Sequence, residues 1–162
     1  MNYYSEKAKK LFNSGYNCAQ SVFCAFSDDL GIDFETALKL SSSFGGGMGR
    51  LREVCGAVSA MFMIAGLKKG YTEANNDEVK EKHYALIQEL GKEFEKRTGS
   101  LICRELLNLD IKHDTPKPSK RTEQYYKERP CEDFIATAAE ILMQKINFHD
   151  KIEKSQDKYI KN

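Results

Sequence analysis

The sequence lacks a closely spaced pair of cysteines, although it contains five cysteines among its 162 residues. Zinc ribbons, c-type haem sites and thioredoxin-like motifs all need such a pair, so we expect none of them. No C-x-x-C-H sequence is present, and we therefore expect no haem. Any sulfur site in this chain must be assembled from cysteines that lie far apart in the sequence.

A long apolar run and an excess of one charge are also missing. The longest apolar stretch, residues 54–67, is shorter than the ~20 residues of a membrane span, so we expect no membrane insertion. Lys and Arg number 25 and Asp and Glu number 24, which gives no electrostatic reason to expect nucleic acid as a partner. The first residues show no basic and apolar leader, and we expect a cytoplasmic location.

Helical periodicity, in contrast, runs through nearly the whole chain. It predicts an all-α, single-domain helical bundle over residues 1–150 and a charged tail over residues 151–162. The expected helices cover residues 4–13, 18–26, 34–42, 55–67, 76–96, 101–107 and 131–147. The helix over residues 55–67 is apolar on nearly every side and should be the central buried element. The polar segment 108–129, which contains Pro116 and Pro118, is expected to be a mobile loop or lid.

Four of the five cysteines lie where a helix is expected to begin. Asn17 and Gln20 form a capping-box pattern around the first, and Pro130, which suits the first helical position, precedes the last. We name these four residues the helix-start cysteines: Cys18, Cys55, Cys103 and Cys131. Unpaired N–H groups and the positive end of the helix dipole favour a thiolate. We therefore expect lowered thiol pKa values and helix starts that converge on one site.

The residues around these cysteines resemble a known family. Residues 44–49 read Phe-Gly-Gly-Gly-Met-Gly and are followed by Cys55-Gly56-Ala57, with isolated cysteines before and two after. This pattern resembles the redox-active family named C_GCAxxG_C_C over nearly the whole chain. The family's shared cysteines would correspond to the helix-start cysteines. Ala60 stands where the family motif C-G-A-x-x-G has its last glycine.

The resemblance implies a redox role for the site. The family is similar to the cysteine-bearing part of split-Soret cytochromes, in which an iron–sulfur centre accompanies haem. Because this chain has no haem-attachment sequence, only the iron–sulfur part of that comparison applies to it. The resemblance therefore narrows the chemistry without naming a reaction.

Three roles for the helix-start cysteines stay open. They could hold an iron–sulfur cluster for electron transfer or, without metal, act as redox-active thiols that cycle between dithiol and disulfide. They could instead bind zinc or another metal in a non-catalytic module that stores, delivers or senses it. They could also be small buried residues without a chemical role. We expect the redox role, with an oxidoreductase or a membrane transporter as partner and a homodimer as a reasonable assembly.

The glycine-rich segment before the helix at residues 55–67 is a second candidate site. A nest of backbone N–H groups there could bind a phosphate or carboxylate, and the residues of this candidate are Gly45, Gly46, Gly47 and Arg50. Arg52 would add a further positive charge. The segment matches neither a P-loop nor G-x-G-x-x-G, so a tight turn that positions Cys55 is the stronger expectation.

Two other residues with reactive side chains are expected to be structural. Cys24 lies about 240° around its helix from Cys18, which places it outside the expected sulfur site. His83 falls on the apolar face of the helix at residues 76–96, where it could act as a fifth ligand or proton donor. A hydrogen-bonded histidine in the core is the more common arrangement.

Overall fold

The computed structural model describes residues 2–148, which are helical apart from their connections and one isolated β-bridge between Val54 and Ile102. The elements are α1 (Tyr3–Asn13), α2 (Cys18–Ala25), α3 (Ser27–Leu30), α4 (Phe34–Ser41), η1 (Ser42–Phe44), α5 (Gly45–Met48), α6 (Gly56–Lys69), α7 (Asp77–Thr98), α8 (Cys103–Leu106), α9 (Glu123–Glu128) and α10 (Cys131–Lys145). The predicted all-α class is confirmed. The predicted tail, residues 151–162, lies outside the described residues.

Helix starts follow the capping residues in the sequence. In five helices the side chain before the first helical residue accepts a hydrogen bond from a backbone N–H of the first turn. These capping residues are Asn2, Asn17, Asp33, Asn76 and Thr122. The predicted capping box at Asn17 and Gln20 is present, which fixes the start of α2 at Cys18.

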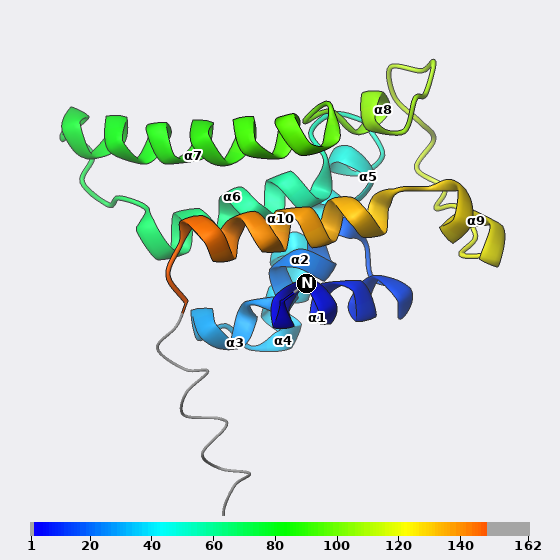
Figure 1. Cartoon of the computed structure of the whole chain (residues 1–162), viewed down its shortest axis with the longest axis horizontal. Helices are drawn as coiled ribbons and strands as arrows, with labels where there is room; N and C mark the ends of the chain where they lie inside the picture. Colours follow the sequence, from blue (N-terminus) through cyan, green and yellow to red (C-terminus); the bar gives the residue numbers. More distant parts are fainter. Residues whose placement is uncertain (1, 149–162) are drawn as a thin grey trace, which may run out of the picture.

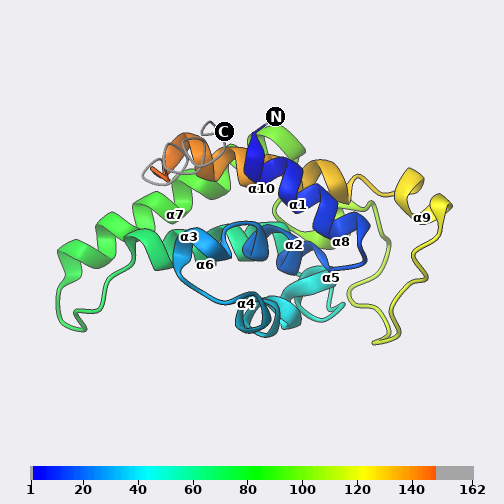
Figure 2. The same cartoon turned by 90° about the horizontal axis from the view of Figure 1, so that it is seen from below.

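The helices form three layers around α2 and α6. Seen from below, α2 and α6 occupy the middle, with α1, α7 and α10 on one side and α4 and α5 on the other (Figure 2). The expected central helix is confirmed, because eight residues of α6 are buried, including Val58, Ala60 and Met61. Ala60 is 0% exposed, so the small residue at this position lies in a close helix contact. No helix among residues 2–148 is long and apolar enough to cross a membrane.

The segment between α8 and α10 differs from the expected loop. Residues 123–128 form α9, which begins after its cap Thr122 and ends before Pro130. Residues 108–122 have no helix, as expected. Figure 1 shows this segment at the same end of the molecule as α5 and α8. We name residues 108–129 the covering segment, because it supplies one side of the cavity described below.

The connection from α4 to α6 contains a run of left-handed backbone conformations. Three of its glycines have positive φ, and so do Met48, Arg50 and Arg52. Positive φ is unfavourable for residues with a side chain, so surrounding contacts must hold these three in place. Gly47 is required for a second reason, since a β-carbon there would lie 2.6 Å from Cβ of Cys103. The predicted tight turn is present and brings the chain directly against α8.

Substitution of Gly47 by alanine should therefore destabilise the protein. We expect Gly47→Ala to lower the free energy of unfolding by about 2 kcal/mol or more, from the left-handed conformation and the clash with Cys103 and nearby backbone. Gly66→Ala is the matched control, because a β-carbon at this helical glycine meets nothing within 4 Å. It should raise stability by about 0.5–1 kcal/mol. Urea unfolding curves of the two variants would test this, and equal stabilities would contradict it.

Candidate functional site

The starts of four helices surround one cavity of about 210 Å³. Cys18, Cys103 and Cys131 are the first residues of α2, α8 and α10, and Cys55 directly precedes α6. The predicted position of these cysteines at helix starts is confirmed. All four line the cavity, so the structure brings together cysteines that are separated by tens of residues in the sequence.

Close backbone contacts hold the helix starts together. A β-carbon at Gly56 would lie 2.8 Å from the carbonyl oxygen of Phe44 and 3.2 Å from Cβ of Cys18, so the start of α6 packs tightly against that of α2. The N–H of Cys55 donates to the carbonyl of Leu101 at 2.8 Å, and the N–H of Cys103 donates to that of Glu53 at 2.6 Å. These reciprocal hydrogen bonds tie Cys55 to Cys103.

Burial and neighbouring sulfur atoms raise the pKa values of three thiols. A hydrogen bond with Cys131, together with burial, raises the pKa of Cys18, although Arg121 acts in the opposite direction. Burial raises the pKa of Cys55 despite the N–H groups of Ala57 and Val58 at the helix start. The expectation of lowered pKa values is therefore wrong for these cysteines, because the helix start does not compensate for lost hydration.

The pKa of Cys103 is also raised by burial, and a neighbouring arginine opposes this rise. Burial raises the pKa of Cys103, and the hydrogen bond from Arg52 and its positive charge lower it. The Nη1 of Arg52 lies 3.7 Å from the sulfur of Cys103. The thiol remains above the usual pKa of a cysteine, so the expected lowering is wrong here too.

Arginine is the second chemical component of the site. Four arginines line the cavity: Arg50, Arg52, Arg121 and Arg129. Within the described chain, no Asp or Glu is among the lining residues. A lining of thiols and guanidinium groups without carboxylates is complementary to negative charge.

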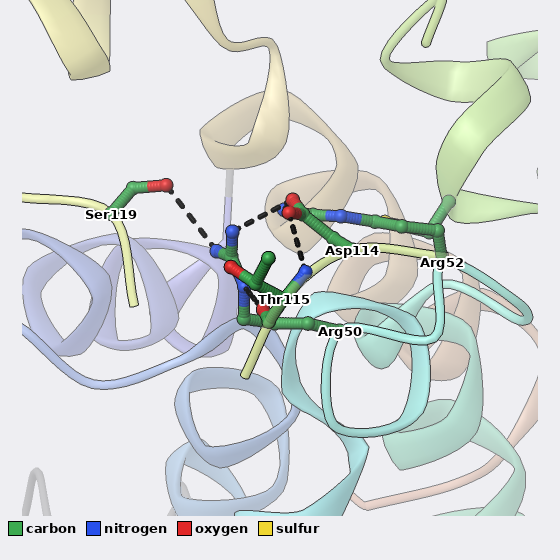
Figure 3. A network of polar contacts seen from close by, with 6 residues as sticks. Arg50, Arg52, Asp114, Thr115 and Ser119 are labelled. Atoms are coloured by element: carbon green, nitrogen blue, oxygen red, sulfur yellow. Dashed lines mark hydrogen bonds and ion pairs between the residues drawn. The ribbon is translucent and has the colours of Figure 1, made fainter. Parts of the chain in front are cut away.

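Arg52 connects Cys103 to Asp114 of the covering segment, and Figure 3 shows its contact with Asp114. Its side chain is almost completely buried, and its Nη2 donates to Oδ2 of Asp114 at 2.8 Å. The Nε of Arg52 is buried and has no hydrogen-bond partner. Arg50 binds the same carboxylate oxygen at 2.7 Å and also donates to the carbonyl of Thr115 and the hydroxyl of Ser119. Asp114 thus pairs with two arginines at once.

This pairing lowers the pKa of the Asp114 carboxyl group. The hydrogen bond from Arg52, the N–H of Thr115 and the charge of Arg50 lower the pKa of Asp114 to about 2. The carboxylate is therefore ionised at neutral pH. Its stabilising effect on the fold is complete above the ordinary Asp pKa of about 3.9 and is lost as the pH falls toward about 2.

The other two cavity arginines are held by aromatic rings and backbone. Arg121 donates to the carbonyls of Phe12 and Tyr16, and its guanidinium carbon lies 4.5 Å from the ring centre of Phe12. Arg129 lies 4.7 Å from the ring centre of Tyr125. Within residues 2–148 neither arginine has a carboxylate partner, in contrast to Arg50 and Arg52.

The glycine segment belongs to the same cavity as the cysteines. Its predicted anion-binding residues all line the cavity: Gly45, Gly46, Gly47 and Arg50. Arg50, however, is already engaged with Asp114 and the covering segment. The residues of the two candidate sites therefore line one cavity.

Cys24 and His83 lie away from the cavity. Cys24 is fully buried in the core, and burial raises the pKa of its thiol to about 11. His83 is partly buried on α7, with its ring 5.8 Å from that of Tyr71, and it lines a different pocket. Neither residue lines the cavity that the four cysteines share.

Sequence reasoning missed the residues of the covering segment. Arg121, Tyr125 and Arg129 line the cavity, and Asp114 fixes two of its arginines. They follow no motif, and nothing in a polar stretch with prolines distinguishes them from ordinary loop residues. Only the fold places them near the cysteines.

The donor set of four thiols suits a soft metal centre. Thiolates are the ligands of iron–sulfur clusters and of zinc. Among residues 2–148 no group of three or more His, Cys, Asp or Glu side chains is arranged to hold a metal ion. The cavity far exceeds the ~10–15 Å³ that one water molecule needs.

Comparison with known proteins gives one match. A family described as "Putative redox-active protein (C_GCAxxG_C_C)" matches residues 16–145, a range that contains all four helix-start cysteines. No curated protein and no solved structure matches the chain.

The raised thiol pKa values predict slow alkylation. In reduced, metal-free protein, iodoacetamide should modify Cys18, Cys55 and Cys103 more slowly near pH 8 than in the urea-unfolded chain, since less thiolate is present. Their rates should continue to rise above pH ~8.5, where an ordinary cysteine begins to level off. Mass spectrometry of the labelled peptides would measure this, and rates that level off below pH 8 would contradict it.

Loss of the Asp114 carboxylate should release the covering segment. We expect Asp114→Asn to speed trypsin cleavage after Lys112 or Lys120 roughly tenfold, because charged hydrogen bonds from Arg50 and Arg52 are lost. Asp110→Asn removes an exposed carboxylate of the same segment and should leave the rate unchanged. Equal cleavage rates for the two variants would show that the ion pairs do not hold the segment.

Proposed function

The chain belongs to the C_GCAxxG_C_C family of redox-active proteins, and on that premise we propose that it transfers electrons through a sulfur centre held by the helix-start cysteines. The proposed centre is an iron–sulfur cluster. The observation that supports it is the meeting of all four cysteines at one arginine-lined cavity. When bound, such a cluster would supply one-electron exchange at a potential set by its surroundings.

The protein's own residues would favour the negative charge of such a centre. The N–H groups at the helix starts and the four cavity arginines compensate for thiolate charge in a buried site. Arg52 has a direct role, since it donates to the sulfur of Cys103. Hydrogen bonds and positive charge near ligating sulfur stabilise the reduced form and raise the reduction potential.

The raised thiol pKa values disfavour free thiol exchange at neutral pH. Thiol exchange is fastest when the attacking thiol has a pKa near the ambient pH, whereas Cys18, Cys55 and Cys103 are held protonated by burial and one another. A metal centre would displace these protons, so its binding should strengthen as the pH rises.

One observation favours a second candidate, a dithiol–disulfide couple. Cys18 and Cys131 are in hydrogen-bond contact across the cavity, which makes them the natural pair for a disulfide. Such a couple would use two of the four cysteines and would leave Cys55 and Cys103 without a role. A single zinc ion is a further alternative for four thiolate ligands, and it would need all of them close to one point.

Purification without oxygen tests the proposal. We expect brown protein that contains iron and acid-labile sulfide, and Cys55→Ala should lose both, because it removes a cavity thiol. Cys24→Ala, which removes a core thiol outside the cavity, should keep the colour and the iron. Visible absorption spectra with metal and sulfide analysis give the result.

The other outcomes identify the alternatives. Wild-type protein that stays colourless and iron-free after anaerobic reconstitution with iron and sulfide would refute the cluster. Zinc in that protein would then indicate a metal-binding module. A metal-free protein with a reversible disulfide between Cys18 and Cys131 would indicate thiol chemistry.

A further inference from the structure

The cavity has two chemically different parts. Its deep part contains Cys55, Cys103 and Cys131, which are 5–7% exposed. Its outer part is formed by residues of the covering segment that are partly or fully exposed: Pro118, Ser119, Arg121, Tyr125 and Arg129. The sulfur atoms therefore lie beneath a rim that carries positive charge.

The positive charge of the rim has no counterion within the described chain. Asp114 pairs with Arg50 and Arg52, whereas no carboxylate of residues 2–148 lies within ion-pair distance of Arg121 or Arg129. Aromatic rings hold both guanidinium groups in place at the cavity. Partly buried charges that are fixed in position and lack a counterion favour a bound ion of opposite sign.

Arg52 provides an independent indication of a ligand. Its side chain is 1% exposed and lines the cavity, yet its Nε has no hydrogen-bond partner. Buried polar groups in proteins are almost always paired, and an exception calls for an explanation such as an absent ion. The left-handed backbone at Arg52 shows that the chain accepts strain to hold this side chain inward.

We propose that the cavity binds a small oxyanion, such as sulfate or phosphate, at its arginine-lined rim. Arg121 and Arg129 supply the charge, and the hydroxyl of Ser119 supplies a further hydrogen-bond donor. The volume of about 210 Å³ lies below the ~300–1,000 Å³ of pockets for larger organic ligands, which favours a small ion. This proposal rests on the proposed function in one respect: the oxyanion site and the sulfur centre lie in the same cavity.

Calorimetric titration of sodium sulfate into the reduced, metal-free full chain tests this. We expect saturable binding below about 10 mM sulfate, with sodium chloride of equal ionic strength giving no such signal. Arg129→Gln should weaken binding at least tenfold, since a charged hydrogen bond is lost. Arg129→Lys should recover only part of it, because an ammonium group lacks the fork of donors.

Two controls separate this proposal from loss of folding and from the sulfur centre. Arg97→Gln removes an arginine of α7 that pairs with Glu93, and sulfate affinity should not change. Cys55→Ala should lose the metal centre but retain sulfate binding. Absent sulfate binding in wild type, or unchanged affinity in Arg129→Gln, would overturn the oxyanion site even if the protein is brown. Sulfate binding by a colourless protein would sustain the oxyanion site and leave the electron-transfer proposal refuted.

Discussion

The close contact between the starts of α2 and α6 is the constraint on which the rest of the site depends. Gly56 has no side chain, and only for that reason can its backbone lie against Phe44 and Cys18. The backbone hydrogen bonds between residues 53–55 and 101–103 then place Cys103 beside Cys55. Gly47 makes the same kind of approach to Cys103 from the other side. Three close backbone contacts thus place Cys18, Cys55 and Cys103 before any ligand is considered.

This arrangement concentrates positive charge at one end of the molecule. The N-terminal ends of α2, α6 and α10 meet there, and each carries the positive end of a helix dipole. Four arginines add to the charge, and within residues 2–148 only Asp114 offsets it by direct pairing. Protonated thiols cannot balance this field. A thiolate-bound cluster or a small oxyanion would each supply the negative charge that balances it. This shared need for negative charge connects the two proposals.

The predictions from sequence succeeded where local chemistry decides the structure and failed where distant groups do. Asn17 and Gln20 were enough to place the start of α2, and the apolar surface of residues 55–67 was enough to identify the central helix. The pKa values of Cys18, Cys55 and Cys103 were predicted in the wrong direction, because burial and the contact between Cys18 and Cys131 depend on other elements. The helix α9 was missed within a segment whose prolines suggested only a loop.

The sequence by itself determined the all-α class, the position of each cysteine at a helix start and membership of the family, because capping residues, apolar spacing and motif letters are local properties of the chain. The tertiary structure alone decided that the glycine segment and the cysteines share a cavity, that Arg121 and Arg129 line it, and that Arg52 is buried beside Cys103. The physical reason is that charge, burial and sulfur contacts arise between residues that the sequence separates and only packing brings together.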